Sequence, residues 1–381
     1  MKLFESEANN LSYRHILITG GAGFIGSHVA DELLRHGHHV RVLDNLTPQV
    51  HGGAAPDYLD PDVEWFDGDI RDARAVERAL RGIDAVYHFA ATVGVGQSMY
   101  EIERYTDINC VGTAILLEAL ARRPVERLVV ASSMSIYGEG LYRSADGAVR
   151  IVGERSVDQL KRSQWEFADE NGAPLVPLPT PETKTPALSS IYALTKYAQE
   201  RSCLMIGRAY RIPTVALRFF NVYGPRQALS NPYTGVLAIF AARYLNDNPP
   251  LVFEDGRQQR DFVSVHDLAR ACRLCLDASD APGHAINIGS GKAYSICELA
   301  ERMACVLGKE NVGIEITGKY RMGDIRHCFA DTTLARNLIG YEPRVSLEQG
   351  MVELADWLAD RRPDDHVENA RAELSARGLT L

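Results

Sequence analysis

Short apolar runs alternate with amphipathic stretches through the first 220 residues of the chain. The runs are rich in Val, Ile, Leu and aromatic residues, as in strands buried on both faces of a parallel sheet, and the stretches between them repeat apolar positions at helical spacing. The runs lie at residues 15–18, 40–43, 63–66, 85–91, 128–131 and 214–220, and the helical stretches at 27–34, 71–80, 105–122 and 189–211. The alternation predicts an α/β fold with a doubly wound parallel sheet and right-handed crossovers.

Two regions depart from this alternation. Residues 138–190 mix charged residues with a cluster of prolines, and irregular connections of that length are usually functional or mobile. Beyond residue 220 the pattern is less regular, with elements expected at 260–263, 265–277, 285–288 and 295–307. We therefore expect a first domain at 13–220 that carries the insertion 138–190, and a smaller C-terminal α/β substrate lobe at 221–360, with some chain crossing between them. Residues 361–381 are expected to form a terminal helix or tail.

Composition and charge narrow the class of protein. The 381 residues are 46% hydrophobic and 24% charged, as in ordinary globular proteins. A net charge of −9 argues against nucleic acid or an anionic membrane as the main partner. No run approaches the length of a membrane span, and the first dozen residues lack the apolar core of a signal peptide.

The number and positions of the cysteines indicate the cellular compartment. Seven cysteines, an odd number, are scattered through the expected helices and strands, which favours a reduced cytoplasmic protein. Cys272 and Cys275 form a CxxC pair, but a helical pattern contains them and no second pair follows. We interpret both as core residues and expect no structural metal.

A glycine-rich segment, TGGAGFIG, joins the first expected strand to the first expected helix. A glycine turn in this position lets backbone N–H groups approach a phosphate, and the helix N-terminus adds partial positive charge. The second strand ends at Asp44, 18 residues beyond Gly26, where a Rossmann-type dinucleotide fold places the acid that holds the adenosine ribose. A carboxylate there repels a 2′-phosphate, so the expected cofactor is NAD rather than NADP.

Tyr192 and Lys196 lie four residues apart in the expected helix 189–211, which places both on one helical face. A phenol has a pKa of about 10, and a neighbouring ammonium lowers it by favouring the phenolate. The hydroxyl of Ser133, which follows the fifth strand, can share the proton with a substrate oxygen. The three residues predict removal of a hydroxyl proton while hydride leaves the carbon that bears it.

These motifs together resemble the extended short-chain dehydrogenase/reductases, and more narrowly their nucleotide-sugar epimerase/dehydratase family. The resemblance covers residues 15–357 and rests also on Gly68-Asp69-Ile70, on Ser132-Ser133 with Tyr137-Gly138, and on RFFNVYGP at 218–225. It implies tightly bound NAD, a tyrosine base, a nucleoside-diphosphate sugar as substrate, and a homodimer formed through the helices at 105–122 and 189–211.

The same resemblance implies the site residues. The catalytic residues are Ser133, Tyr192 and Lys196. The cofactor contacts are Gly20, Gly23, Phe24, Ile25, Gly26, Asp44, Asn45, Asp69, Ile70, Phe89, Ala90, Ala91, Asn109, Tyr192, Lys196 and Phe219. The substrate contacts are Ser133, Ser135, Tyr192, Asn221, Arg260 and Arg321. Guanidinium groups suit a diphosphate, although a structural ion pair is the alternative for each arginine.

The residues after Ser133 separate the reactions of the family. The resembling 4,6-dehydratases carry an Asp-Glu pair there, the UDP-glucuronate decarboxylases a glutamate at the position of Ser135, and the GDP-mannose 3,5-epimerases a cysteine. Met134 and Ser135 stand here instead. This favours a 4-epimerase, which oxidises C4 and returns hydride to the other face. The alternatives are a nucleotide-sugar dehydrogenase, ketoreductase or dehydratase of the same family, or a non-catalytic dinucleotide-binding regulator.

The insertion carries a narrower resemblance. Ser163-Gln164-Trp165-Glu166 and the segment 175–182 are similar to bacterial dTDP-L-rhamnose 4-epimerase-like proteins, as is the segment 253–262. Those proteins often hold cysteine pairs in the insertion, whereas this chain has no cysteine between Cys110 and Cys203. The alternative is a surface elaboration that makes no contact with substrate.

Overall fold

A seven-stranded sheet forms the centre of the computed structural model, which describes residues 14–52, 54–227, 235–321, 323–359, 376–378 and 380. The strand order is β14-β9-β5-β4-β1-β2-β3, and every pairing is parallel. The strands are β1 (His15–Thr19), β2 (His39–Asp44), β3 (Glu64–Asp67), β4 (Ala85–His88), β5 (Arg127–Ser133), β9 (Thr214–Phe219) and β14 (Ala285–Ile288). The predicted α/β fold is thus confirmed. The direction of winding reverses between β1 and β4, where open parallel sheets bind ligands.

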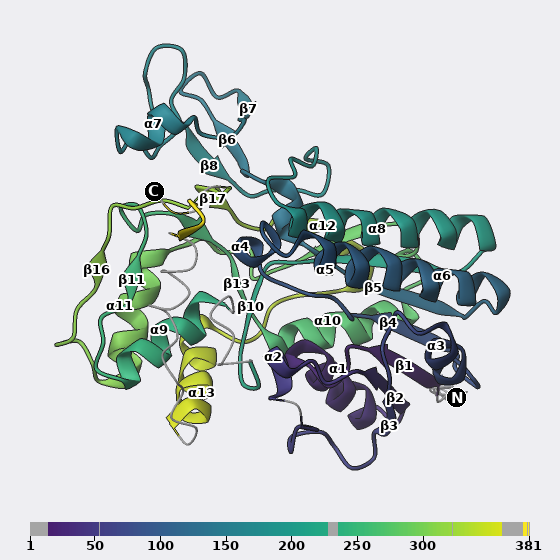
Figure 1. The fold of residues 1–381 in the computed structure, drawn as a ribbon. Coiled ribbons are helices and arrows are strands. Elements are labelled where there is room, and N and C mark those ends of the chain that lie inside the picture. The colour runs from purple at the N-terminus through teal and green to yellow at the C-terminus, as the bar shows by residue number, and fades with distance from the viewer. Residues whose placement is uncertain are drawn as a thin grey trace, which may run out of the picture.

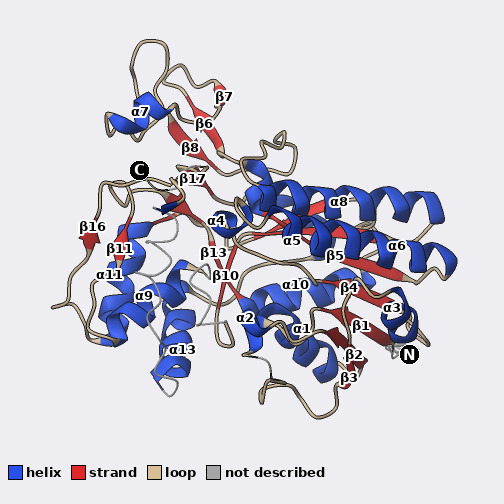
Figure 2. Cartoon of the chain, in the orientation of Figure 1, coloured by secondary structure: helices blue, strands red, loops and turns tan. Residues whose placement is uncertain are grey.

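Helices cover both faces of this sheet (Figures 1 and 2). Side chains alternate between the faces, so Ile16 and Ile18 belong to one buried cluster and Leu17 to the other. The first cluster is covered by α1 (Phe24–Arg35) and α10 (Val265–Asp277). The second is covered by α3 (Ala73–Ala79), α6 (Gly112–Arg122) and α8 (Ile191–Tyr210). The short helix α5 (Ile102–Thr106) continues through a π-helical segment (Asp107–Val111) into α6, where a single helix was predicted.

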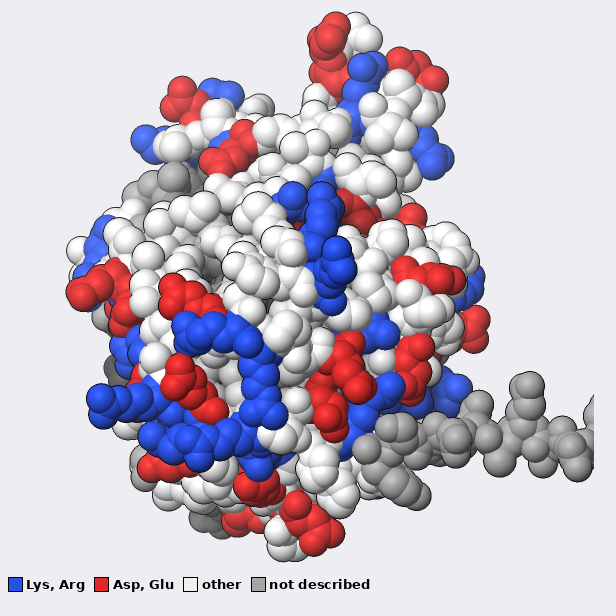
Figure 3. All heavy atoms as spheres, turned by 90° about the vertical axis from the view of Figure 1, so that its right-hand side faces the viewer, with Lys and Arg blue, Asp and Glu red and all other residues white. Residues whose placement is uncertain are grey.

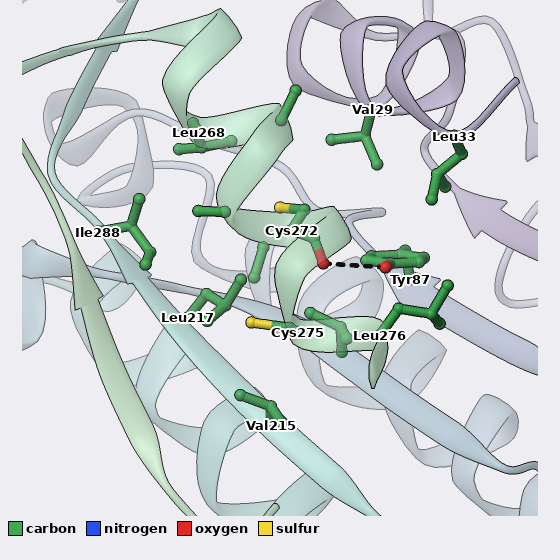
Figure 4. Close-up of a cluster of buried hydrophobic side chains, with 14 of the residues drawn as sticks. Val29, Leu33, Tyr87, Val215, Leu217, Leu268, Cys272, Cys275, Leu276 and Ile288 are labelled. Atoms are coloured by element: carbon green, nitrogen blue, oxygen red, sulfur yellow. Dashed lines mark hydrogen bonds between the residues drawn. The ribbon is translucent and has the colours of Figure 1, made fainter. Parts of the chain in front are cut away.

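Helix α10 lies in the core of the sheet domain, as Figure 4 shows. Cys272 and Cys275 are fully buried there, and the Tyr87 hydroxyl donates to the Cys272 carbonyl oxygen at 3.0 Å. The interpretation of both cysteines as core residues is therefore confirmed. The sequence placed α10 and β14 in the smaller lobe, but β14 pairs with β9 and α10 packs against α1. Apolar residues on both elements complete the main core, so the chain returns to the sheet domain after residue 264.

The smaller lobe is built around three helices that pack on one another, α9 (Val236–Leu245), α11 (Ile296–Leu307) and α13 (Leu347–Ala359). Short strands form three small separate sheets: β10 (Asn221–Tyr223) with β13 (Phe262–Ser264), β11 (Leu251–Val252) with β16 (Glu315–Ile316), and β12 (Gln259–Arg260) with β15 (Tyr294–Ser295) and β17 (His327–Cys328). Short helices complete the description, namely α2 (Pro48–His51), α4 (Val95–Ser98) and α12 (Thr333–Ile339). The expected terminal helix or tail falls mostly at 361–375, outside the described residues.

The insertion forms a small antiparallel sheet that projects from the body of the molecule (Figure 1). It contains β6 (Leu141–Arg143), β7 (Val149–Ile151), α7 (Val157–Lys161) and β8 (Val176–Leu178). Its base is anchored by buried charges: Arg155 makes two hydrogen bonds to Glu254 at 2.8 and 2.9 Å. The fully buried Arg326 of the lobe pairs with Glu254 at 2.9 Å and with Glu166 of the insertion. The insertion is thus attached to the substrate lobe by ion pairs that would be costly to break.

The surface carries both signs of charge. On the face shown in Figure 3, acidic and basic side chains are interspersed rather than gathered into one basic stripe. This pattern accords with the net charge of −9. Within the described residues, no helix has the length and apolar character needed to cross a membrane.

Candidate functional site

The glycine turn between β1 and α1 is too tightly packed for any side chain at two of its positions. A Cβ on Gly26 would lie 2.4 Å from the Gly20 carbonyl oxygen. Gly20 has a φ of +72°, and a Cβ there would lie 2.8 Å from the Ala90 backbone nitrogen. Helix α1 begins after Gly23, which supplies no side-chain cap, so its first N–H groups are free to face an anion. The turn therefore fits the pyrophosphate of a dinucleotide.

Asp44 ends β2 beside this turn. Its carboxylate accepts from the backbone N–H groups of Ala22 (3.1 Å) and Leu46 (3.0 Å), which fix its orientation. Burial raises the Asp44 pKa, while the N–H groups and the nearby His51 oppose that rise. Arg41 points elsewhere, because its guanidinium donates to Glu64 at 2.8 Å. No arginine on β2 thus offsets the negative charge that disfavours a 2′-phosphate.

One cavity of about 490 Å³ joins the glycine turn to the catalytic residues. It lies beyond the carboxyl ends of the strands, as the sheet order requires. The sequence-predicted residues that line it are Gly20, Gly23, Phe24, Ile25, Gly26, Asp44, Asn45, Asp69, Ile70, Phe89, Ala90, Ala91, Ser133, Ser135, Tyr192, Lys196, Phe219 and Asn221. Residues from distant parts of the chain thus share one site, although their individual roles stay predictions.

Tyr192 stands in the first turn of α8, which Ser190 caps by accepting from the Ala193 N–H at 3.1 Å. Burial raises the Tyr192 pKa, and a hydrogen bond with Ser133 opposes that rise. Ser133 ends β5, and its Oγ lies 2.8 Å from the Ser135 Oγ. Lys196 follows one turn later on α8, and burial lowers its pKa to about 8. The site therefore holds a phenol, a hydroxyl and an ammonium around one cavity.

Asn109 does not line the cavity but supports the helix that does. It lies in the π-helical segment, and such segments within α-helices are frequent at functional sites. Its side-chain amide accepts from the Thr92 N–H at 2.7 Å and donates to the Thr195 hydroxyl at 3.0 Å. Asn109 therefore connects the cavity wall at Thr92 to α8, between Tyr192 and Lys196.

The two predicted arginines also lie outside the residues that line the cavity. The Arg260 guanidinium donates to the carbonyl oxygens of Gln259 (2.9 Å) and Arg326 (2.8 Å), in addition to Asp324 at 3.3 Å. Arg321 is exposed and pairs with Asp324 at 2.9 Å. In this arrangement both arginines make structural contacts, the alternative left open by the sequence, and a diphosphate contact stays a prediction.

Several cavity residues were not found from the sequence. His51 ends the short helix α2 in the loop region between β2 and β3, with its Nε2 3.8 Å from an Asp44 oxygen. Gln227 follows the RFFNVYGP motif and also lines the cavity. Ile108 and Val95 come from the helices that follow β4. The Pro- and Gly-rich composition of the loop carried no signal for His51, whereas proximity to a recognised motif could have indicated Gln227.

Comparisons with a family model, with a related protein and with solved structures all indicate the same family. The NAD dependent epimerase/dehydratase family model matches residues 16–154 and 166–289. A dTDP-L-rhamnose 4-epimerase of Burkholderia thailandensis is 36% identical over 351 residues, covering 91% of this chain and 95% of that protein. The crystal structure of a UDP-glucose 4-epimerase with UDP-glucose from Thermotoga maritima is 31% identical, with a TM-score of 0.75 over 91% of this chain and 99% of that one. A UDP-glucose 4-epimerase complex with NAD from Thermus thermophilus is also 31% identical, with a TM-score of 0.72 and the same coverage.

Proposed function

The chain belongs to the NAD-dependent epimerase/dehydratase family, and from that premise we propose that it is a nucleotide-sugar 4-epimerase. The observation that carries this proposal is the shared cavity, which combines the glycine turn and Asp44 with Ser133, Tyr192 and Lys196. Such a set serves proton transfer at a hydroxyl together with hydride transfer at its carbon.

Different residues of the chain would bind the cofactor, transfer the proton and stabilise the phenolate. The glycine turn and Asp44 would hold NAD, which supplies a hydride acceptor that can return the hydride to the same substrate. Tyr192 takes the proton from the sugar hydroxyl at C4 and later gives it back, while Ser133 bonds the same oxygen. The Lys196 ammonium favours the phenolate form of Tyr192 by its charge. The walls of the cavity exclude bulk water and orient the sugar.

The described residues that line the cavity include no acid beside Ser133, and this distinguishes the reaction from elimination. Among the cavity residues that the structure describes, the carboxylates are Asp44 and Asp69. Asp44 ends β2 and Asp69 follows β3, whereas Met134 and Ser135 follow Ser133. Loss of water would need an acid beside the sugar, so a redox-neutral epimerisation fits this cavity better.

We propose dTDP-L-rhamnose as the first substrate to test, with UDP-glucose second. The support is the 36% identity to the Burkholderia protein named above and the docked insertion. Purified protein would be incubated with each nucleotide sugar without added reductant, and the product analysed by mass spectrometry and NMR. A product of unchanged mass with inverted C4 supports the proposal. A product that has lost water or carbon dioxide would refute it, as would a reaction that proceeds only with added cofactor and consumes that cofactor.

We also propose a homodimer formed through α5, the π-helical segment and α8. These helices pack side by side, and they expose Ile102, Val111, Leu194 and Met205 at 51, 45, 49 and 56%. Half-exposed apolar side chains on adjacent helices suit a second copy of the chain. Sedimentation velocity should show a dimer for the wild type and a monomer for Met205→Glu; a monomeric wild type would refute the interface.

The proposed location is the cytoplasm. All seven cysteines are unpaired, and four of them are buried in positions where they act as apolar core residues. Cell fractionation of the producing organism, with a periplasmic marker as control, tests this proposal.

A further inference from the structure

A 3₁₀ helix (Met134–Tyr137) directly follows β5 and carries Ser133 at its N-terminus. The Ser133 Oγ accepts from the Ser135 backbone N–H at 3.2 Å and also bonds the Ser135 hydroxyl at 2.8 Å. The side chain of Ser133 is thus oriented by the helix it caps. Ser133 and the Tyr137 carbonyl thus lie at opposite ends of one four-residue helix.

The end of the insertion holds the other end of the same helix. The Lys184 Nζ donates to the Tyr137 carbonyl oxygen at 2.6 Å, and the Ala187 N–H donates to the Ile136 carbonyl oxygen at 2.9 Å. The chain passes so close that a Cβ on Gly138 would lie 2.6 Å from the Ala187 carbonyl oxygen. The last carbonyls of the 3₁₀ helix are therefore bonded by residues of the insertion.

Lys184 is a buried lysine whose ammonium bonds carbonyl oxygens, which is unusual for a purely structural contact. Its side chain is 3% exposed, and its second hydrogen bond goes to the Thr185 carbonyl oxygen at 3.2 Å. Within the described residues, no carboxylate lies at ion-pair distance from it. Burial lowers the Lys184 pKa, which Cys328 and Glu139 oppose. A buried ammonium bonded to carbonyls costs desolvation, but it is favoured at the carbonyl end of a helix.

The segment that presents Lys184 is itself fixed to the central sheet. The Glu182 carboxylate accepts from the Asn287 N–H of β14 at 2.8 Å. The Glu182 carbonyl oxygen accepts from Arg218 of β9 at 3.1 Å. Lys184 is thus held by the same sheet whose strand β5 leads to Ser133, and this gives the contact a defined geometry.

We propose that Lys184 is a positioning residue for the reaction: by holding the last carbonyl of the 3₁₀ helix, it keeps the Ser133 hydroxyl against Tyr192. This gives the end of the insertion a role in the reaction. The sequence alone did not decide whether the insertion is functional or is a surface elaboration that makes no contact with substrate. The inference rests on the proposed function, because Ser133 and Tyr192 are taken as the proton-transfer pair. Lys184 acts through the helix and does not line the cavity.

The first experiment compares Lys184→Met with Lys184→Arg in the full-length protein. Lys161→Met, an exposed lysine elsewhere in the insertion, is the matched control. Lys184→Met should lower kcat at least about tenfold while KM changes by less than about twofold, because ground-state binding does not need the aligned pair. The acidic limb of the kcat profile should move up by about one pH unit, since Tyr192 loses the hydrogen bond that favours its phenolate. Lys184→Arg should recover most of kcat, and Lys161→Met should match the wild type.

A second readout needs no turnover. Tyrosinate absorbance is titrated for each protein and for the same protein with Tyr192→Phe, and the difference gives the titration of Tyr192. Tyr192 is hydrogen-bonded to Ser133, its ring centroid lies 6.5 Å from that of Tyr105, and Lys196 lines the same cavity. None of these three residues is altered in the variants. A midpoint raised by about one pH unit in Lys184→Met alone supports the proposal.

The outcomes separate the two proposals. If the wild type epimerises no nucleotide sugar, the proposed function fails, while the tyrosinate titration still decides the role of Lys184. An unchanged midpoint in a folded Lys184→Met protein overturns the positioning role, as does an equal change in Lys161→Met. If Lys184→Met does not fold, Lys184→Gln, which is one atom shorter and uncharged, takes its place. An intermediate rise in its midpoint is expected, and no rise in a folded protein overturns the proposal.

Discussion

Lys196 donates a hydrogen bond to the side-chain oxygen of Gln199 at 2.7 Å, one turn further along α8. The Gln199 amide in turn donates to the Thr113 hydroxyl at 2.8 Å, which fixes its orientation. His88 lies beside the same amide, and burial lowers its pKa to about 3, so it adds no second positive charge near the ammonium. Gln199 thus positions the ammonium without neutralising it.

The pKa of Lys196 sets an upper limit to the active pH range. Burial lowers it to about 8, so the ammonium is complete well below pH 8 and is lost as the pH rises through that value. Because the charge favours the Tyr192 phenolate, kcat should fall above about pH 8. Gln199→Glu places a carboxylate beside the ammonium, which raises the Lys196 pKa and should move this alkaline limb upward by about one pH unit or more. A limb that stays in place in kcat profiles of both proteins would show that another group controls it.

Tyr192→Phe removes the proposed base while keeping the ring and its packing against Tyr105. General acid–base groups contribute about 10² to 10⁴ in rate, so kcat should fall at least about 100-fold. The thermal midpoint and the amount of NAD that copurifies should stay close to wild type, because the hydroxyl is not needed for either. Initial rates are measured with the nucleotide sugar that the wild type epimerises. Retained turnover would assign the proton transfer to another residue.

The predicted residues that line the cavity belong to motifs of local geometry. The strand–turn–helix at Gly20–Gly26, the acid at the end of β2 and the i, i+4 pair on α8 are each defined by spacing within one or two elements. The hydrophobic alternation likewise predicted the layered sheet, since buried parallel strands are uniformly apolar. These features need no knowledge of the distant chain.

The features that the sequence did not predict depend on contacts between distant segments. Strand β14 has only four residues, and nothing local shows that it adds to β9 across 65 residues of intervening chain. Asn109 and Arg260 make hydrogen bonds to Thr195 and Arg326, which lie 86 and 66 positions away in sequence. The anchoring of the insertion through Arg326 was equally invisible, because the charges that pair with it come from separate segments.

Gly26→Ala tests the fit of the glycine turn. The added methyl group would lie 2.4 Å from the Gly20 carbonyl oxygen and 2.6 Å from the Gly21 Cα, so the turn must open. We expect a loss of copurifying NAD, measured by absorbance after denaturation, and an affinity for added NAD at least about tenfold weaker. Gly153→Ala is the matched control, because its Cβ meets no atom within 4 Å and its φ is not positive. Equal NAD content in the two variants would contradict the assignment.

Substitution of Asp261 should lower the stability of the fold, because its carboxylate is fully buried and surrounded by hydrogen-bond donors. One oxygen accepts from the N–H (2.7 Å) and hydroxyl (2.8 Å) of Ser290, and the other accepts from the N–H groups of Gly291 (2.8 Å) and Ala330 (3.2 Å). Asp261→Asn keeps the shape but must turn an NH₂ group toward backbone donors in either orientation. A buried donor that faces a donor leaves both unsatisfied, so the free energy of unfolding should fall by about 2 kcal/mol or more. Urea denaturation measures this against Asp57→Asn, which makes the same charge change at an exposed position. An equal effect in both variants would show that charge rather than hydrogen bonding is responsible. Because the Asp261 carbonyl oxygen also accepts from Asn221 at 2.8 Å, the same loss should loosen a wall of the cavity and raise KM before the protein unfolds.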